Sequence, residues 1–277
     1  MVCQAGSEIV DKAPLISVIL TTYNRAAKLE RALSSVLHQD YPALELVVVD
    51  DGSTDGTSSL MESRRAKSPQ VKYVRHLQNR GNAAARNTGV DAASGRYIAF
   101  MDDDDEWIDP KKLAKQIRVL GGAGRQLGLV ATSVNLVDSA GKSVRKPITK
   151  PRDLRAWLLR RNGIIYSPTV LTSKSIILEA GMFDTNISRG VDSTFYRTVV
   201  LDLGYDIEIM PDVTTNIYES GDDRMSSNIG TEQLRRSFQS ELYTVRKFVR
   251  HYVRYPGALV SRLRSLSKTL LKIALTR

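Results

Sequence analysis

Continuous apolar runs that alternate with helical patterns over residues 15–101 constrain the fold more than any other feature of this sequence. The runs are LISVILTTY (15–23), LELVVVD (44–50), VKYVRH (71–76) and GRYIAFM (95–101). Helical patterns follow the first run at 25–38 and the third at 82–93, and a polar helix that ends at about Arg65 follows the second run and its DGSTDGT motif. Strands whose apolar residues run on without alternation are covered on both faces. The spacing therefore predicts βαβ units in a mostly parallel sheet, flanked by helices, of the α/β class.

The middle of the chain continues with mixed elements. We expect helices at 109–120, 152–161 and 189–204, the last closed by Gly204, and strands at 127–138, 168–172, 206–210 and 213–218. His38 and His76 fall at the ends of expected elements and are expected at the surface.

The positive charge is concentrated at the C-terminus. The chain carries 40 Lys and Arg against 30 Asp and Glu, but residues 231–277 hold eleven of the basic and only two of the acidic residues. The first 230 residues are nearly balanced, with 29 basic and 28 acidic residues. A protein that binds nucleic acid through the basic tail is one reading, but the balanced body and the acidic motifs described next argue against it.

The C-terminal segment has the pattern of an amphipathic basic helix. An apolar stripe is formed by Leu259, Leu263, Leu266, Leu270 and Ile273, with Arg264, Lys268 and Lys272 on the other side. This pattern predicts that residues 258–277 lie on an anionic membrane surface. The alternative is that the stripe packs on the domain or on a second subunit of a homo-oligomer.

The remaining composition predicts a cytoplasmic protein. The one cysteine, Cys3, allows no internal disulfide, which fits a reducing compartment. The segment MVCQAGSEIVDKAP lacks an apolar core, and no stretch approaches the length of a membrane span, so we expect neither a secretory signal nor a transmembrane helix.

Polar motifs follow each of the four predicted strands. TTYNR, DDGSTDG, LQNRGNAAARN and MDDDDEW come after the first, second, third and fourth strand respectively. In an open α/β sheet ligands bind beyond the carboxyl ends of the strands, so the four motifs together predict one cleft. A single Asp-rich strand end could be a mere cap, but four at one edge favour a binding site.

The residue types suggest a nucleoside diphosphate and its metal. Asp102–Asp105 repel one another unless they surround a hard divalent cation such as Mg²⁺ or Mn²⁺. Asp50 and Asp51 can accept hydrogen bonds from a base or ribose, and Tyr23 offers a ring face. Arg86 offers a fork for phosphate, with a salt bridge to one of the aspartates as its alternative.

With these motifs in this order, the sequence strongly resembles the family 2 glycosyltransferases, which have the GT-A fold. The residues that carry the resemblance are ISVILTTYNR, ELVVVDDGSTDGT, NRGNAAARNTG and GRYIAFMDDDDEW; it covers residues 15–110 closely and 165–230 more loosely. The resemblance implies transfer of a sugar from a nucleotide-sugar donor, with inversion at the anomeric carbon. UDP is the most frequent nucleotide of the donors in this family.

The resemblance also implies roles for individual residues. Positions matching Thr21 and Tyr23 contact the nucleoside, the position matching Asp51 hydrogen-bonds uracil, and the one matching Arg86 lies at the nucleotide. The Asp-x-Asp motif matches Asp102-Asp103-Asp104. Asp104 and Asp105 would contact ribose and metal, with Asp105 as the direct metal ligand. Asp102 would support these two residues. Asp103 occupies a variable position of the motif, so Asp103→Ser should have only a mild effect on activity.

The general base implied by the resemblance is Asp192. Relatives carry a Glu-Asp pair there, whereas this chain has Arg189-Gly190-Val191-Asp192, so only the aspartate remains. Its alternative is a helix N-cap. Arg224 is in the loop 217–228, where relatives have a mobile segment that closes over the diphosphate. It could contact that group, and a solvated loop arginine is the alternative. Ser237 replaces the tryptophan of the Gln-x-x-Arg-Trp motif of processive members, which favours transfer of a single sugar.

The expected organisation follows from these assignments. Residues 1–13 form a flexible tail, 14–110 the nucleotide-sugar-binding half, 111–230 the acceptor-binding half of the same domain, and 231–277 a basic helical extension. Together with the tail, the resemblance implies a polyprenyl-linked or other glycan acceptor at the inner face of the cell membrane. A sugar-1-phosphate nucleotidyltransferase is the alternative, but TTYNRAAKLE lacks the glycine-rich loop that such an enzyme needs.

Overall fold

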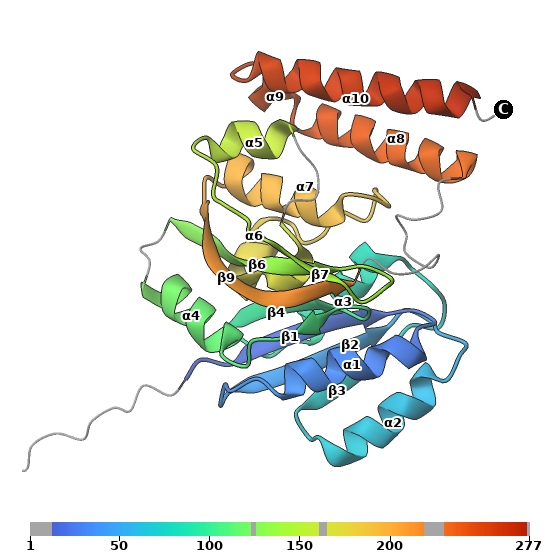
Figure 1. Cartoon of the computed structure of the whole chain (residues 1–277), viewed down its shortest axis with the longest axis vertical. Coiled ribbons are helices and arrows are strands. Elements are labelled where there is room, and N and C mark those ends of the chain that lie inside the picture. The colour runs from blue at the N-terminus through green and yellow to red at the C-terminus, as the bar shows by residue number, and fades with distance from the viewer. Residues whose placement is uncertain (1–12, 123–125, 161–164, 219–229, 276–277) are drawn as a thin grey trace, which may run out of the picture.

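The computed structural model describes residues 13–122, 126–160, 165–218 and 230–275, and its centre is one mixed β-sheet (Figure 1). Nine strands in the described ranges join it in the order β3-β2-β1-β4-β8-β6-β9-β5, with β7 paired to β6. The predicted α/β class is confirmed. The predicted tail 1–13 lies almost wholly outside the described residues.

The strands and helices have the following bounds. The strands are β1 (Ile16–Thr22), β2 (Leu44–Asp50), β3 (Val71–Arg75), β4 (Tyr97–Asp102), β5 (Glu106–Trp107), β6 (Leu127–Val137), β7 (Ser143–Lys146), β8 (Leu171–Ser173) and β9 (Asp206–Tyr218). The helices are α1 (Ala26–Leu37), α2 (Thr57–Lys67), α3 (Asn82–Ala92), α4 (Lys112–Gly122), α5 (Leu154–Arg160), α6 (Lys174–Glu179), α7 (Val191–Arg197), α8 (Thr231–Lys247), α9 (Val249–Tyr252) and α10 (Pro256–Leu275).

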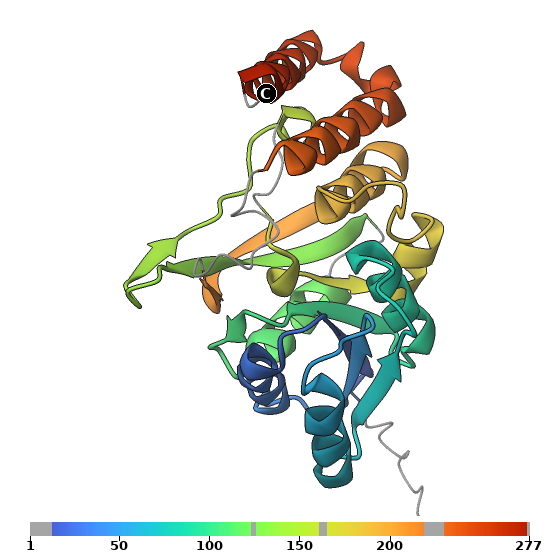
Figure 2. The same cartoon turned by 90° about the vertical axis from the view of Figure 1, so that its right-hand side faces the viewer.

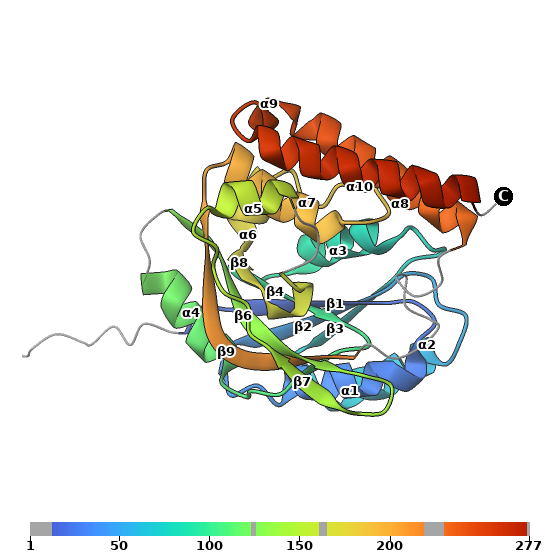
Figure 3. The same cartoon turned by 45° about the horizontal axis from the view of Figure 1, so that its top comes forward.

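The first half of the sheet is parallel and buried on both faces. Strands β3, β2, β1 and β4 pair in parallel, whereas β8, β7 and β5 join antiparallel, so the sheet is mixed beyond β4. Alternate residues of each strand face opposite sides. In β1, Val18 and Leu20 pack toward α1, α2 and α4, while Ile19 packs toward α3, α6 and α7. Figure 3 shows α3 on one side of β1–β3 and α1 and α2 on the other.

Several elements differ from the sequence-based expectations. The two short strands at 206–210 and 213–218 are one strand, β9, whose register against β6 shifts around Pro211 and Asp212. Proline has no N–H to donate, so the ladder accommodates it in a bulge. The helix expected at 189–204 changes after Arg197 into a π-helical segment (Thr198–Asp202), and Gly204 ends it with a φ of 80°. Strands β5 and β7 and helix α6 were not expected.

The last three helices form a further layer on the domain. Helices α8 and α10 lie over α5 and α7, on the side of the molecule away from α2 (Figures 1 and 2). A separate apolar cluster joins them, made of Leu159, Leu201, Val245, Phe248, Tyr252, Ala258 and Leu266. The basic extension expected at 231–277 is thus packed against the domain. Of the helices within the described ranges, none combines the length and apolar character needed to cross a bilayer.

Candidate active site

The carboxyl ends of β1, β2, β3 and β4 lie side by side because their register is aligned. Thr22 pairs with Asp50, Asp50 with Arg75, and Thr21 with Asp102. The loops that follow these strands therefore leave the sheet at one edge. The structure brings together the polar motifs that the sequence predicted to share a cleft.

Two arginines hold the acidic turn after β4: Arg25, which directly precedes α1, and Arg31 within α1. Arg25 Nη1 lies 2.9 Å from Asp103 Oδ1 and 2.9 Å from Asp104 Oδ2. Asp103, expected to be the least constrained of the four aspartates, is only 5% exposed. Burial raises the pKa of Asp103 to about 6, and the positive charge of Arg25 opposes this rise.

Asp105 faces the far side of the turn, where β9 ends. Its Oδ1 accepts a hydrogen bond from the backbone N–H of Tyr218 at 3.2 Å, and the residue is 3% exposed. The Tyr218 hydroxyl donates to Glu106 Oε2 at 2.7 Å. Arg31 lies 3.6 Å above the Tyr218 ring and donates to the Asp104 carbonyl oxygen at 2.5 Å. The end of β9 and the acidic turn are therefore tied together.

Arg86 joins two of the predicted site residues. Its Nη2 lies 3.0 Å from Asp102 Oδ1, and its Nη1 contacts Asp192 Oδ1. The Arg86 side chain is 2% exposed, whereas those of Asp102 and Asp192 are 32% and 31% exposed. Gly190 rather than Asp192 is the N-cap of α7, and no side chain caps the helix. Arg86 thus forms the salt bridge that the sequence left as its alternative, and it places Asp192 at the strand edge.

Asp51 organises the loop before α3. Its carboxylate accepts hydrogen bonds from the backbone N–H groups of Arg80 and Gly81 at 2.9 and 2.8 Å. His76 Nδ1 lies 2.7 Å from Asp51, and His76 is 8% exposed. The expectation that His76 is a surface residue was therefore wrong. Its place at the end of an expected strand suggested exposure, but its partner is 25 residues away.

Asp50 lies beneath the site and is fully buried. It accepts hydrogen bonds from the Ser53 N–H and from the Tyr73 hydroxyl, both at 2.7 Å. Burial and then the bond to Asp50 raise the pKa of Tyr73 to about 12. Gly52 follows with a φ of 84°, and a Cβ there would lie 2.7 Å from the Gln78 backbone, so the turn requires glycine. Asp50 therefore stabilises the turn that follows β2.

The remaining predicted site residues lie at the end of β1 or outside the described ranges. Tyr23 is 44% exposed and presents its ring directly after β1. Thr21 Oγ1 lies 3.4 Å from Asn82 Oδ1 at the start of α3. Arg224 lies outside the described residues.

Sequence reasoning missed Arg25, Arg31 and Tyr218. Arg25 stands inside the quoted TTYNR motif, so its place next to a strand end was visible, but its partners lie 78 and 79 residues away. Arg31 looked like an ordinary exposed position of a helix. Tyr218 gave no signal, because its role depends on the end of β9 meeting the acidic turn.

The donor set of the acidic turn fits a divalent cation only in part. Carboxylate oxygens are the hard ligands that Mg²⁺ and Mn²⁺ prefer, and Asp104 and Asp105, which are neighbours in the sequence, carry such oxygens. Within the described ranges, no three His, Cys, Asp or Glu side chains are arranged to hold a metal together. A cation here would need water or phosphate oxygens to complete its shell.

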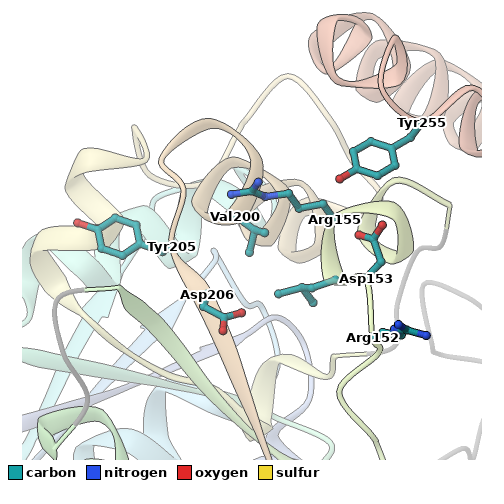
Figure 4. Close-up of a pocket in the computed structure, with 8 residues that line it drawn as sticks. Arg152, Asp153, Arg155, Val200, Tyr205, Asp206 and Tyr255 are labelled. Atoms are coloured by element: carbon teal, nitrogen blue, oxygen red, sulfur yellow. The ribbon is translucent and has the colours of Figure 1, made fainter.

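A separate surface hollow lies at the opposite edge of the sheet, near the start of β9. It has a volume of about 550 Å³, and its lining includes Arg152, Arg155, Tyr205, Asp206 and Tyr255 (Figure 4). Asp206 is paired with Lys150 at 2.6 Å. None of the predicted site residues lines this hollow. The chemistry-bearing groups are at the other edge, so we place the candidate site there.

Comparison with protein families finds one match that covers more than half of the chain. The model described as glycosyl transferase family 2 matches residues 17–171, which includes β1 to β4 and the acidic turn. The succinoglycan biosynthesis protein ExoO of Rhizobium meliloti is 36% identical over 136 residues, 49% of this chain and 38% of that protein. A GalNAc(5)-diNAcBac-PP-undecaprenol beta-1,3-glucosyltransferase of Campylobacter jejuni is 39% identical over 96 residues, 34% of this chain and 31% of that protein. The matches thus span less than two thirds of these relatives.

Solved structures show the same fold over nearly the whole chain. A mannosyltransferase from Pyrobaculum calidifontis, solved in complex with GDP-Man and Mn²⁺, superposes with a TM-score of 0.68. The match covers 96% of this chain and 74% of that one, at 24% sequence identity. At this identity the likeness concerns the fold, which is the GT-A fold expected from the sequence.

Proposed function

This chain belongs to glycosyl transferase family 2, and we propose that it moves one sugar from a nucleotide-sugar donor to a hydroxyl group of a glycan acceptor. The observation that carries the proposal is the shared strand edge, where Arg86 joins Asp102 to Asp192 beside the acidic turn. We take a UDP-sugar as the first donor to test, because the family resemblance favours UDP.

The donor would lie across the ends of β1, β2 and β4. The exposed Tyr23 ring can stack on the base. We propose that Thr21 and Asp51 contact the nucleoside, and that Asp50 supports them from below. Asp102 and Asp104 would face the ribose. Arg224, outside the described residues, is our candidate for the diphosphate.

Asp192 is our candidate for the general base. Its carboxylate would take the proton of the acceptor hydroxyl while that oxygen attacks the anomeric carbon. The bond from the anomeric carbon to the diphosphate oxygen breaks in the same step, so the nucleoside diphosphate leaves and the configuration inverts. Arg86 holds one oxygen of Asp192, which orients the carboxylate and leaves its other oxygen for the acceptor.

Asp104 and Asp105 are the residues that would hold Mg²⁺ or Mn²⁺. When bound, such a cation neutralises the charge that develops on the departing diphosphate. Asp104 would then contact both the cation and Arg25, because the Arg25 guanidinium lies 2.9 Å from the Asp104 carboxylate.

We further propose a polyprenyl-linked glycan as the acceptor and the cytoplasmic face of the membrane as the place of action. The support is the similarity to a relative whose name describes an undecaprenyl-linked acceptor. A lipid-linked acceptor would bring this chain to the membrane surface as a peripheral protein. We do not expect nucleic acid as a partner, because the body of the chain is nearly charge-balanced.

Donor binding and transfer should be measured separately. Thermal shift with UDP-, GDP- and dTDP-sugars, with and without Mn²⁺, identifies the donor, since a bound ligand raises the melting temperature by mass action. Asp105→Ala should abolish the metal-dependent shift. Asp192→Asn should keep the shift and lower transfer about 100-fold or more.

The exposed Asp91→Asn is the matched control and should change neither readout. Donor binding and transfer that are equally strong in the presence of a chelator would contradict the metal-assisted reaction.

A further inference from the structure

Helix α10 is fixed on the domain by one of its faces. Ala258, Arg262 and Leu266 are 0%, 3% and 6% exposed. Arg262 Nε donates to the Leu159 carbonyl oxygen of α5 at 2.7 Å, and its Nη1 lies 3.4 Å from Glu241 of α8. These contacts fix the rotation of α10 about its own axis. They also determine which side chains face away from the protein.

The opposite face of α10 is apolar and exposed. Val260, Leu263, Leu270, Leu271 and Leu275 are 47%, 50%, 49%, 61% and 76% exposed. Successive helical residues turn by about 100°, which places Val260, Leu271 and Leu275 on the side away from Ala258 and Arg262, and Leu263 and Leu270 on the flank next to them. With Val249 and Val253, they make seven of the twelve exposed large apolar side chains in the described ranges. Exposed large apolar side chains are thus concentrated at the two C-terminal helices, and five of them are on α10 itself.

Basic side chains run beside this outward apolar face. Arg264, Lys268 and Lys272 are exposed, and the helical spacing places them in a row along one of its edges. Residues 256–277 contain no Asp or Glu. The outward surface of α10 therefore combines leucines with a purely positive charge, on the outermost layer of the molecule (Figures 1 and 3).

We propose that this outward face of α10 docks on a bilayer surface that carries anionic lipid headgroups. The helix lies parallel to the bilayer, with its leucines at the boundary of the acyl chains and its basic row against the headgroup phosphates. A second copy of the chain fits less well, because two such helices would bring positive charges together without a carboxylate on either. The proposal does not depend on the proposed transfer reaction.

The docking face differs from the stripe expected from the sequence alone. That stripe contained Leu259, Leu266 and Ile273, but Leu266 is buried and the other two are partly buried. Only Leu263 and Leu270 belong to both. The structure therefore assigns Val260, Leu271 and Leu275 to the membrane in place of three residues that are buried or partly buried.

Co-sedimentation of the full chain with vesicles tests the proposal. The chain should pellet with vesicles of one part phosphatidylglycerol to two parts phosphatidylcholine, but stay in solution with phosphatidylcholine alone. The triple variant Leu263→Ser/Leu270→Ser/Leu271→Ser should partition at least about tenfold more weakly. Arg264→Gln/Lys268→Gln should also weaken binding, and added salt should weaken the wild type.

Two matched variants serve as controls. Leu178→Ser replaces a leucine that is 51% exposed on α6, and Arg65→Gln/Lys67→Gln removes two exposed cations from α2. Both should bind vesicles like the wild type. Melting temperature and nucleotide-induced thermal shift show whether each variant is folded, and a failure of donor binding alone would overturn the proposed function but not this docking.

Either of two results would overturn the docking proposal. One is a wild-type chain that stays in solution with the anionic vesicles. The other is a leucine triple variant that binds them as well as the wild type. If the wild type ignores vesicles and the triple variant turns a dimer into a monomer, the face is a contact between copies instead.

Discussion

Arg25 lies between two carboxylates of the acidic turn, and this changes the expected effect of substitutions at Asp103. The sequence suggested that Asp103→Ser would be mild. The structure shows a buried Asp103 whose charge is compensated by Arg25 at 2.9 Å, so a substitution there alters a buried ion pair.

We therefore predict strong coupling between Arg25 and Asp103. Arg25→Gln should lower the free energy of unfolding more in the wild type than in an Asp103→Asn background, with a coupling of about 0.5–3 kcal/mol. Denaturant unfolding of the two single variants and the double variant measures it. The exposed Arg65→Gln is the control and should show no coupling. Additive effects of the two substitutions would contradict the prediction.

Lys112 gives a second prediction, on pH dependence. Its side chain is fully buried, with Nζ 2.7 Å from Gln116 Oε1 and 4.1 Å from the centre of the Trp107 ring. Burial lowers the pKa of Lys112 to about 7, against a partial opposing effect of Asp109. Between about pH 7 and 10 the unfolded chain then binds a proton that the folded chain does not.

The contribution of Lys112 to stability should therefore rise as the pH increases through this window and be lost as the pH falls toward 7. The change is on the order of 4 kcal/mol at most. Lys112→Met should flatten the profile, which urea unfolding between pH 6.5 and 9.5 measures. A wild-type profile that matches that of the variant would show that the buried lysine keeps its charge.

At the scale of elements, the contact between α3 and β1 depends on a glycine. A Cβ at Gly89 would lie 2.4 Å from Ile19 Cγ2, which is too close for any side chain without movement of the helix. Because α3 carries Arg86, this contact also sets the position of the guanidinium at the site. Gly121, near the end of α4, has nothing within 4 Å of the same atom.

We predict opposite effects of alanine at these two glycines. Gly89→Ala should destabilise the protein by about 1–3 kcal/mol through overpacking, and should weaken donor binding as Arg86 moves. Gly121→Ala should be neutral or stabilising by up to about 1 kcal/mol, because alanine favours the helix. Thermal unfolding compares the two. Equal stability of both variants would mean that α3 shifts without loss.

The sequence predicted elements well where their signal is local. Strands β1 to β4 are long apolar runs, and their expected bounds agree with the structure to within two residues. Strand β7 was missed because all four of its residues are exposed, so it carries no apolar pattern. The two-residue β5 is too short to give a signal.

Of the candidate site, the sequence predicted only the residues that lie at or near the ends of the parallel strands. The positions of Asp102, Arg86 and Asp51 at one edge follow from the parallel register. The partners of Arg25, Tyr218 and His76 depend on loops that meet across the sheet, and spacing along the chain does not encode those contacts.

At the scale of the whole molecule, the C-terminal helices belong to the fold. Deleting residues 258–277 would remove Ala258, Arg262 and Leu266 from a packed cluster, so a deletion cannot separate membrane binding from folding. Point substitutions on the two faces of α10 can.

We predict that the inward and outward leucines of α10 differ in their effect on stability. Leu266→Ala should cost about 2–4 kcal/mol, because it leaves a cavity in the buried cluster. Leu270→Ala, at a position that is 49% exposed, should change stability by less than about 0.5 kcal/mol. Chemical denaturation measures both. Similar losses would show that α10 sits on the domain with a different rotation.

The parallel pairing of β6 with β9 has a consequence for synthesis on the ribosome. Strand β6 ends at Val137, but its partner β9 is complete only at Tyr218. At about 5–20 residues per second, the partner emerges several seconds or more after β6 does. During that interval a long, largely apolar strand has one open edge in a growing chain. We therefore expect chaperones to bind nascent chains that end between Val137 and Tyr218, and to release them once β9 is complete and pairs with β6.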